Sequence, residues 1–162
     1  MAIEINESRE HLSDFLSKHG VGVLATSTKE GKPYAATVYL TYDQQFNIYF
    51  VTKKDTQKSR NLQNNNQAAI AVYDAETQTT VQAEGAVVEV TDPEQVTWVT
   101  NDIWRIAMSV SPNTPPPQTR LAAGGYIAYK LITPSLRMAT FKQQDPADYD
   151  KIFDTVSTRP AM

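Results

Sequence analysis

Four basic side chains lie within eight residues of the sequence, between a predicted strand and a predicted helix. They are Lys53, Lys54, Lys58 and Arg60. The chain as a whole is slightly acidic, with a net charge of −3, so this positive charge is a local feature. A short helix with Asp55 as its predicted N-cap would put Lys58 in the first turn, where free N–H groups attract an anion.

The residues of this basic turn suit a phosphate. A lysine in the first turn opposes the partial positive charge of the helix N-terminus, which is unfavourable unless an anion lies between them. The hydroxyls of Thr52 and Thr56 can donate hydrogen bonds to phosphate oxygens. The alternative interpretation is a solvated turn whose lysines only keep the surface soluble. Both interpretations fit the residues of the turn.

Other kinds of chemistry find little support in the sequence. The absence of cysteine excludes disulfides, thiolate catalysis and cysteine-bound metals. His11 and His19 lie eight residues apart with no acidic cluster at metal spacing, so we predict no metal site. No side chain stands out as a catalytic acid, base or nucleophile, and neither a Gly-x-Ser-x-Gly nor a Gly-x-Gly-x-x-Gly motif occurs. The negative net charge argues against a nucleic-acid-binding protein.

Length and composition predict one domain in the cytoplasm. The chain has 162 residues, of which 41% are hydrophobic, enough for a sizeable core. The first twenty residues contain acidic side chains rather than an apolar signal segment, and no apolar run is long enough to span a membrane. We expect a single domain over residues 1–156 and a loose tail at 157–162.

Alternating apolar and polar residues predict the strands that hold the basic turn. Strands are predicted at residues 21–28, 34–42, 46–52, 68–74, 79–91, 124–133 and 136–142. Helices are predicted after Asn6, after Asp55, after Asp92 and, as a short last helix, after Pro146. Gly85 indicates a bulge or a close approach inside a long strand. Short strands joined by tight turns favour an antiparallel sheet closed into a barrel.

The run from Gly22 to Val90 resembles the flavin-binding split-barrel family typified by pyridoxamine 5'-phosphate oxidase. The shared order is GKPYAATVYLTYD, FNIYFVT, the basic helix, NNNQAAIAVYD and a strand with QAEGAVVEV. The resemblance implies a mainly β (α+β) fold: a six- to seven-stranded antiparallel split β-barrel with peripheral helices. It also implies FMN as the cofactor and a homodimer with the flavin at the interface.

The resemblance assigns the basic turn to the FMN phosphate. FVT followed by Thr56-Gln57-Lys58 matches the family's phosphate-binding pattern. Lys58 and Thr56 would contact the phosphate, with Thr52 and Lys53 beside it.

Other positions would lie along the flavin itself. The residues expected to line it, largely through backbone groups, are Ala36, Thr37, Val38 and Tyr39. Thr80 and Gln82 would reach the ring edge or the ribityl chain. Trp104 would reach the flavin of the other subunit, and a core position in the third helix is its alternative interpretation.

The sequence differs from the oxidase at positions that matter for its reaction. An arginine, a lysine and a glutamine of the oxidase align with Ala35, Leu40 and Thr80, and the closing Arg-Leu-x-Pro signature is absent. We therefore predict a shorter branch similar to general stress proteins, a flavin-dependent oxidoreductase that transfers hydride at flavin N5 to or from a small substrate. The alternatives are a barrel that binds flavin, deazaflavin or haem without turnover, and a structural dimer without a cofactor.

Overall fold

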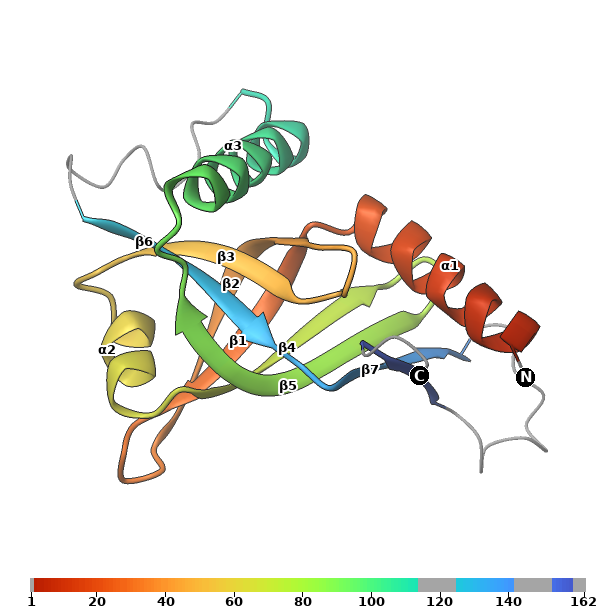
Figure 1. Cartoon of the computed structure of the whole chain (residues 1–162), viewed down its shortest axis with the longest axis horizontal. Helices are drawn as coiled ribbons and strands as arrows, with labels where there is room; N and C mark the ends of the chain where they lie inside the picture. Colours follow the sequence, from red (N-terminus) through yellow and green to blue (C-terminus); the bar gives the residue numbers. More distant parts are fainter. Residues whose placement is uncertain (1, 114–124, 142–152, 159–162) are drawn as a thin grey trace.

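The computed structural model describes residues 2–113, 125–141 and 153–158 (Figure 1). Its elements, in chain order, are α1 (Ala2–Lys18), β1 (Val21–Ser27), β2 (Pro33–Tyr42), β3 (Ile48–Lys53), α2 (Gln57–Asn64), β4 (Gln67–Asp74), β5 (Thr79–Glu89), α3 (Pro93–Val110), β6 (Tyr126–Ile132), β7 (Ser135–Thr140) and β8 (Asp154–Ser157). The seven predicted strands correspond to β1 to β7.

Six of the strands form a closed antiparallel barrel. Their hydrogen-bonded order is β4-β1-β2-β3-β6-β5, and the pairing of β4 with β5 closes the ring. One edge of β5 pairs first with β7, at residues 79–83, and then with β6, at residues 86–89. β8 adds a further strand beyond β7. The predicted mainly β barrel with peripheral helices is confirmed.

Gly85 lies where β5 passes from β7 to β6. A Cβ atom at this position would be 2.1 Å from the carbonyl oxygen of Ile132. Only glycine permits so close a contact between two backbones. The close approach predicted for Gly85 is confirmed.

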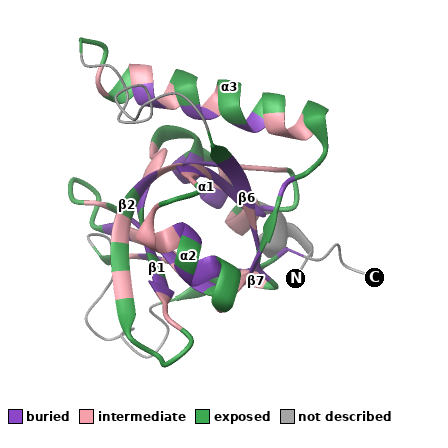
Figure 2. Ribbon diagram, turned by 90° about the vertical axis from the view of Figure 1, so that its left-hand side faces the viewer, coloured by how far each residue is buried: buried purple, intermediate pink, exposed green. Residues whose placement is uncertain are grey.

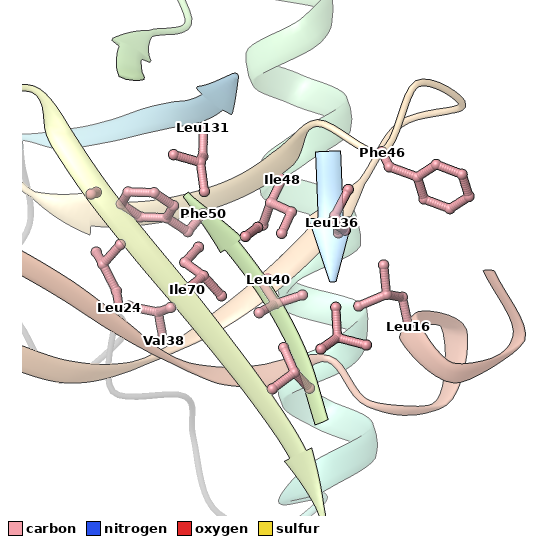
Figure 3. Packing of buried hydrophobic residues seen from close by; sticks show 14 of the residues in the cluster. Leu16, Leu24, Val38, Leu40, Phe46, Ile48, Phe50, Ile70, Leu131 and Leu136 are labelled. Atoms are coloured by element: carbon pink, nitrogen blue, oxygen red, sulfur yellow. The ribbon is translucent and has the colours of Figure 1, made fainter. Parts of the chain in front are cut away.

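Apolar side chains fill the barrel and are closed off at one end by α1. Figure 3 shows part of this core, which includes Leu24, Val38, Leu40, Phe50, Ile70 and Leu131. Leu12, Phe15 and Leu16 of α1 complete it. α2 lies across the opposite end of the barrel (Figures 1 and 2). Within the described part of the chain, no helix is both long and apolar enough to cross a membrane.

α3 covers a second, smaller core on the outside of the barrel. Its buried residues Val99 and Ile103 pack against Tyr49 of β3 and Ala128 of β6. Asp92 caps the helix as predicted, because its carboxylate accepts the N–H of Gln95 at 2.9 Å.

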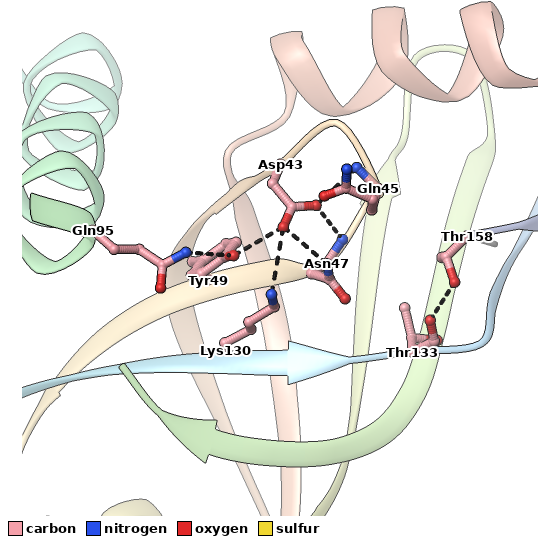
Figure 4. A network of polar contacts seen from close by, with 8 residues as sticks. All are labelled: Asp43, Gln45, Asn47, Tyr49, Gln95, Lys130, Thr133 and Thr158. Atoms are coloured by element: carbon pink, nitrogen blue, oxygen red, sulfur yellow. Dashed lines mark hydrogen bonds and ion pairs between the residues drawn. The ribbon is translucent and has the colours of Figure 1, made fainter. Parts of the chain in front are cut away.

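Polar contacts around Asp43 fasten the β2–β3 turn to α3 (Figure 4). Its carboxylate accepts hydrogen bonds from the backbone and side chain of Asn47 and, at 2.9 Å, from the hydroxyl of Tyr49. The same hydroxyl accepts one from Gln95 of α3, and Lys130 of β6 lies 3.8 Å from the carboxylate. Burial and the neighbouring Asp43 raise the pKa of Tyr49 far above its usual value, so Tyr49 stays neutral.

Two predicted helix starts were wrong. α1 begins at Ala2, so Asn6 lies inside the helix, because the preceding residues also favour helix. Thr56 rather than Asp55 caps α2: its side chain accepts the N–H of Ser59 at 3.3 Å. Both residue types are good N-caps, so sequence alone does not separate adjacent candidates.

The predicted loose tail begins too early. Ser157 belongs to β8, and the hydroxyl of the buried Thr158 donates to the carbonyl of Thr133 at 2.6 Å. These two residues are held because β8 pairs with the otherwise open edge of β7. Residues 159–162 and the predicted helix after Pro146 lie outside the described residues.

Candidate functional site

The basic turn forms one end of a pocket of about 260 Å³. The pocket is lined by Val21, Thr37, Val38, Tyr39, Val51, Thr52, Lys53, Thr56, Lys58, Val110 and Tyr126. Seven of the eleven predicted site residues are therefore together: Thr37, Val38, Tyr39, Thr52, Lys53, Thr56 and Lys58. Ala36, next to Thr37, does not line the pocket. They come from β2, β3 and the start of α2.

The pocket lies where two neighbouring strands separate. β2 and β3 pair only from Leu40 to Tyr42 and from Ile48 to Phe50. Beyond Phe50, β3 continues as the partner of β6 alone, up to Lys53. Among the described strands, none pairs with the β3-facing edge of β2 near Thr37, and the backbone groups of this edge face the pocket.

The two threonine hydroxyls brace the turn. The hydroxyl of Thr56 donates to the carbonyl of Lys53 at 2.9 Å and accepts the N–H of Ser59. Thr52 Oγ1 lies 3.1 Å from Thr56 Oγ1, and because Thr56 has already used its single hydrogen, Thr52 must be the donor. Both hydroxyl hydrogens are thus engaged, which leaves the lysine and backbone N–H groups as the main donors for an anion.

Lys58 is the cation best suited to hold that anion. It is partly buried, and burial lowers the pKa of its ammonium group from the usual 10.5. Its ammonium group makes no ion pair or hydrogen bond with any residue that the structure describes. Lys58 also lies in the first turn of α2, whose backbone N–H groups have no acceptors within the helix. An anion here would therefore satisfy a charge that is already partly desolvated.

The walls of the pocket are apolar and aromatic. They are formed by Tyr39 and by four residues that were not predicted from the sequence: Val21, Val51, Val110 and Tyr126. Tyr126 comes beside Lys53 through the β3–β6 pairing, and Val110 through the packing of α3. Local sequence carries no signal for such long-range pairing. The described lining contains no carboxylate or imidazole, and its titratable side chains are lysines and tyrosines.

Three predicted residues lie elsewhere in this chain. Gln82 and Thr80 point outward from β5, and Gln82 accepts a hydrogen bond from Arg137 at 3.1 Å. Gln82 lines a different pocket, of about 300 Å³, on the outer face of β1, β4 and β5. Trp104 does not line the pocket at the basic turn and is 48% exposed on α3, so its alternative interpretation as a core residue is wrong.

Comparison with known proteins identifies relatives of this architecture. Residues 8–123 match the family described as Pyridoxamine 5'-phosphate oxidase. No curated protein sequence matches the chain.

Several solved structures share the fold. General Stress Protein 26 from Bacillus anthracis is 17% identical, with a TM-score of 0.59 over 80% of this chain and 92% of that chain. A pyridoxamine 5'-phosphate oxidase-related, FMN-binding protein from Nostoc punctiforme is 14% identical, with a TM-score of 0.60 over 94% of this chain and 97% of that one. The heme storage protein HutZ from Vibrio cholerae is 14% identical, with a TM-score of 0.61 over 76% and 88%.

Proposed function

This chain belongs to the pyridoxamine 5'-phosphate oxidase family, and on that premise we propose that its pocket binds FMN, with the phosphate at the basic turn. The observation that carries the proposal is Lys58, a partly buried cation without a described partner at the N-terminus of α2. The FMN-binding relative from Nostoc punctiforme supports the choice of cofactor.

The apolar walls suit the flavin ring. Tyr39, Val51 and Tyr126 offer flat or apolar surfaces, and the open edge of β2 at Thr37 offers backbone hydrogen bonds. Bound FMN would supply hydride transfer, a chemistry that the lining side chains do not themselves provide. We propose a flavin-dependent oxidoreductase acting on a small molecule, in which these residues bind and orient the ring and exclude water.

Two aligned positions argue against oxidation of pyridoxamine phosphate. The oxidase lysine that holds the substrate phosphate corresponds to Leu40, which is 1% exposed in the barrel core. The oxidase arginine that helps hold FMN corresponds to Ala35, which has no charge to offer. Lys58 would therefore carry most of the phosphate interaction in this chain.

We also propose that the protein is a cytoplasmic homodimer, joined through the outer face of β2, β1 and β4. One row of cross-strand partners runs over this face: Thr37, Val23, Ala71, Gln82 and Arg137. Its centre is small and apolar, and Val23 and the neighbouring Tyr73 are 45% and 60% exposed. A two-fold axis parallel to the strands through this centre would bring Gln82 of one copy over Thr37 of the other. Such a dimer would give Gln82 the role predicted for it.

Haem is the second candidate ligand, favoured by the heme storage relative and by two tyrosines in the pocket. Tyrosine can ligate haem iron. The described lining has no histidine, cysteine or methionine, which are the more frequent ligands of haem iron. Haem would also explain the partly buried charge of Lys58 less directly than the phosphate of FMN does.

The test is titration of the purified protein with FMN, riboflavin and haemin, followed by absorbance and flavin fluorescence. We expect FMN to bind more tightly than riboflavin, which lacks the phosphate. Equal affinity for the two flavins would refute the phosphate site, and a haemin complex without flavin binding would favour the second candidate. Reduction of the bound flavin by NADH or NADPH tests the oxidoreductase, and light scattering tests the dimer.

A further inference from the structure

α2 differs from an ordinary surface helix in what it buries. Its buried residues are Ser59, Asn61 and Leu62, so two of the three are polar, with exposed fractions of 0% and 2%. A helix that packs on a barrel normally buries an apolar stripe. Polar side chains in this position add little hydrophobic stabilisation, but their hydrogen bonds are directional and define one orientation of the helix.

Two buried hydrogen bonds join α2 to separate parts of the barrel. The hydroxyl of Ser59 lies 3.0 Å from that of Tyr129 on β6. The side-chain amide of Asn61 donates to the hydroxyl of Thr26 on β1, also at 3.0 Å. β1 and β6 are not neighbours in the ring, because β2 and β3 lie between them. The helix is thus held at two separated points and can neither rotate about its axis nor slide without breaking one of them.

The same contacts reach the first turn of the helix. Asn61 accepts a hydrogen bond from the side chain of Gln57 at 2.8 Å. Ser59 is next to Lys58 in the sequence, and its backbone N–H is the one accepted by Thr56. Gln57, in the first turn, is therefore hydrogen-bonded to Asn61, which anchors the helix. Thr56, the N-cap, is hydrogen-bonded to Ser59, the other anchor.

We propose that the Ser59–Tyr129 and Asn61–Thr26 pairs are positioning pairs for the anion end of the pocket. They set the rotation of α2 so that Lys58 faces the pocket. That the bound anion is the phosphate of FMN rests on the proposed function. The orientation of Lys58 itself does not, and it can be measured without a ligand.

The decisive variant removes both hydroxyls of one pair, Ser59→Ala together with Tyr129→Phe. Replacement of both partners by apolar groups of similar shape leaves no unsatisfied polar group and changes stability little. The ring that packs against Phe50 is kept. The matched control is Thr79→Val together with Thr140→Val, which removes both hydroxyls of another 3.0 Å pair, remote from the pocket.

Affinities for FMN and riboflavin should separate in the double variant. We expect the Kd for FMN to rise about tenfold, the value of one weakened charge-assisted hydrogen bond, while the Kd for riboflavin and the thermal midpoint stay near wild type. The control should leave both affinities unchanged. An unchanged Kd for FMN, or an equal loss for both flavins, would overturn the proposal.

A second measurement uses the protein without ligand. NMR titration of the Lys58 side chain should show its pKa moving back toward the usual value in the double variant, because a misdirected ammonium group is better hydrated. The single variant Tyr129→Phe serves if the double variant does not fold. If wild-type protein fails to bind FMN, the proposed function is wrong, yet the titration still tests the positioning pairs. An identical pKa in variant and wild type would refute them.

Discussion

Replacing Lys58 by glutamine should weaken FMN binding by about 10- to 150-fold. A hydrogen bond to a charged group contributes about 1.5 to 3 kcal/mol, and each 1.4 kcal/mol is a factor of about ten in Kd. The engaged threonine hydroxyls favour the upper part of this range, whereas Lys53, which also lines the pocket, would retain part of the attraction and favours the lower part. Quenching of flavin fluorescence gives the Kd, and riboflavin binding should be unaffected.

The same substitution should stabilise the protein in the absence of ligand. Burial lowers the pKa of Lys58 in the folded state, so the unfolded chain binds this proton more tightly. At neutral pH both states are protonated and the buried charge costs folding free energy. This cost disappears as the pH rises from the folded pKa to the unfolded value near 10.5. Lys58→Gln should therefore melt at a higher temperature than wild type at pH 7, and the difference should vanish above this range.

Saturating FMN should reverse that order, because only wild-type protein gains the full binding energy. Lys54→Gln is the control, since Lys54 belongs to the same basic turn but does not line the pocket. Lys54→Gln should bind FMN as tightly as wild type, and its melting temperature should stay close to that of wild type both without and with FMN. If Lys58→Gln and Lys54→Gln have the same FMN affinity, the phosphate does not bind at the N-terminus of α2.

Three further substitutions test the dimer and the framework. Val23→Asp, at the centre of the proposed interface, should convert the dimer to a monomer in light scattering; a wild-type monomer would contradict the dimer itself. Gly85→Ala forces a Cβ against the carbonyl of Ile132 and should lower the free energy of unfolding in urea by about 3 kcal/mol. Asp43→Ala leaves Tyr49 and the adjoining N–H groups without their acceptor and should also lower the free energy of unfolding by about 3 kcal/mol. Unlike Lys58→Gln, it should keep the FMN affinity of wild type.

The parts of the fold that could be predicted are those with a local signal. Alternation of apolar and polar residues in the sequence predicted β2, and Asp92 followed by Pro93 predicted the start of α3. The basic turn was also local, because strand, N-cap and Lys58 lie within a few residues. Four of the seven predicted residues that share the pocket belong to this turn, and the other three, on β2, were assigned from the family resemblance.

Features that depend on strand register were missed. Tyr126 reaches the pocket only because β6 pairs with β3, more than seventy residues earlier in the chain. β8 is a strand because β7 offers an open edge, and its own four residues carry little pattern. The apolar periodicity of α3 would also allow Trp104 to lie on the buried side of the helix. The helix is instead rotated so that Val99 and Ile103 face the barrel and Trp104 is exposed. Sequence periodicity does not specify this rotation to within one residue.

The most informative signals at the site were violations of local rules. A lysine in the first turn of a helix and polar side chains on its buried face both oppose stability, and both occur within the eight residues of α2. Residues that break such rules concentrate where function requires it. If α2 were only a cap on the barrel, apolar substitutes for Ser59 and Lys58 would improve the protein without loss. The expected rise in melting temperature of Lys58→Gln, together with its loss of FMN affinity, would instead show that stability has been exchanged for an anion site at this helix.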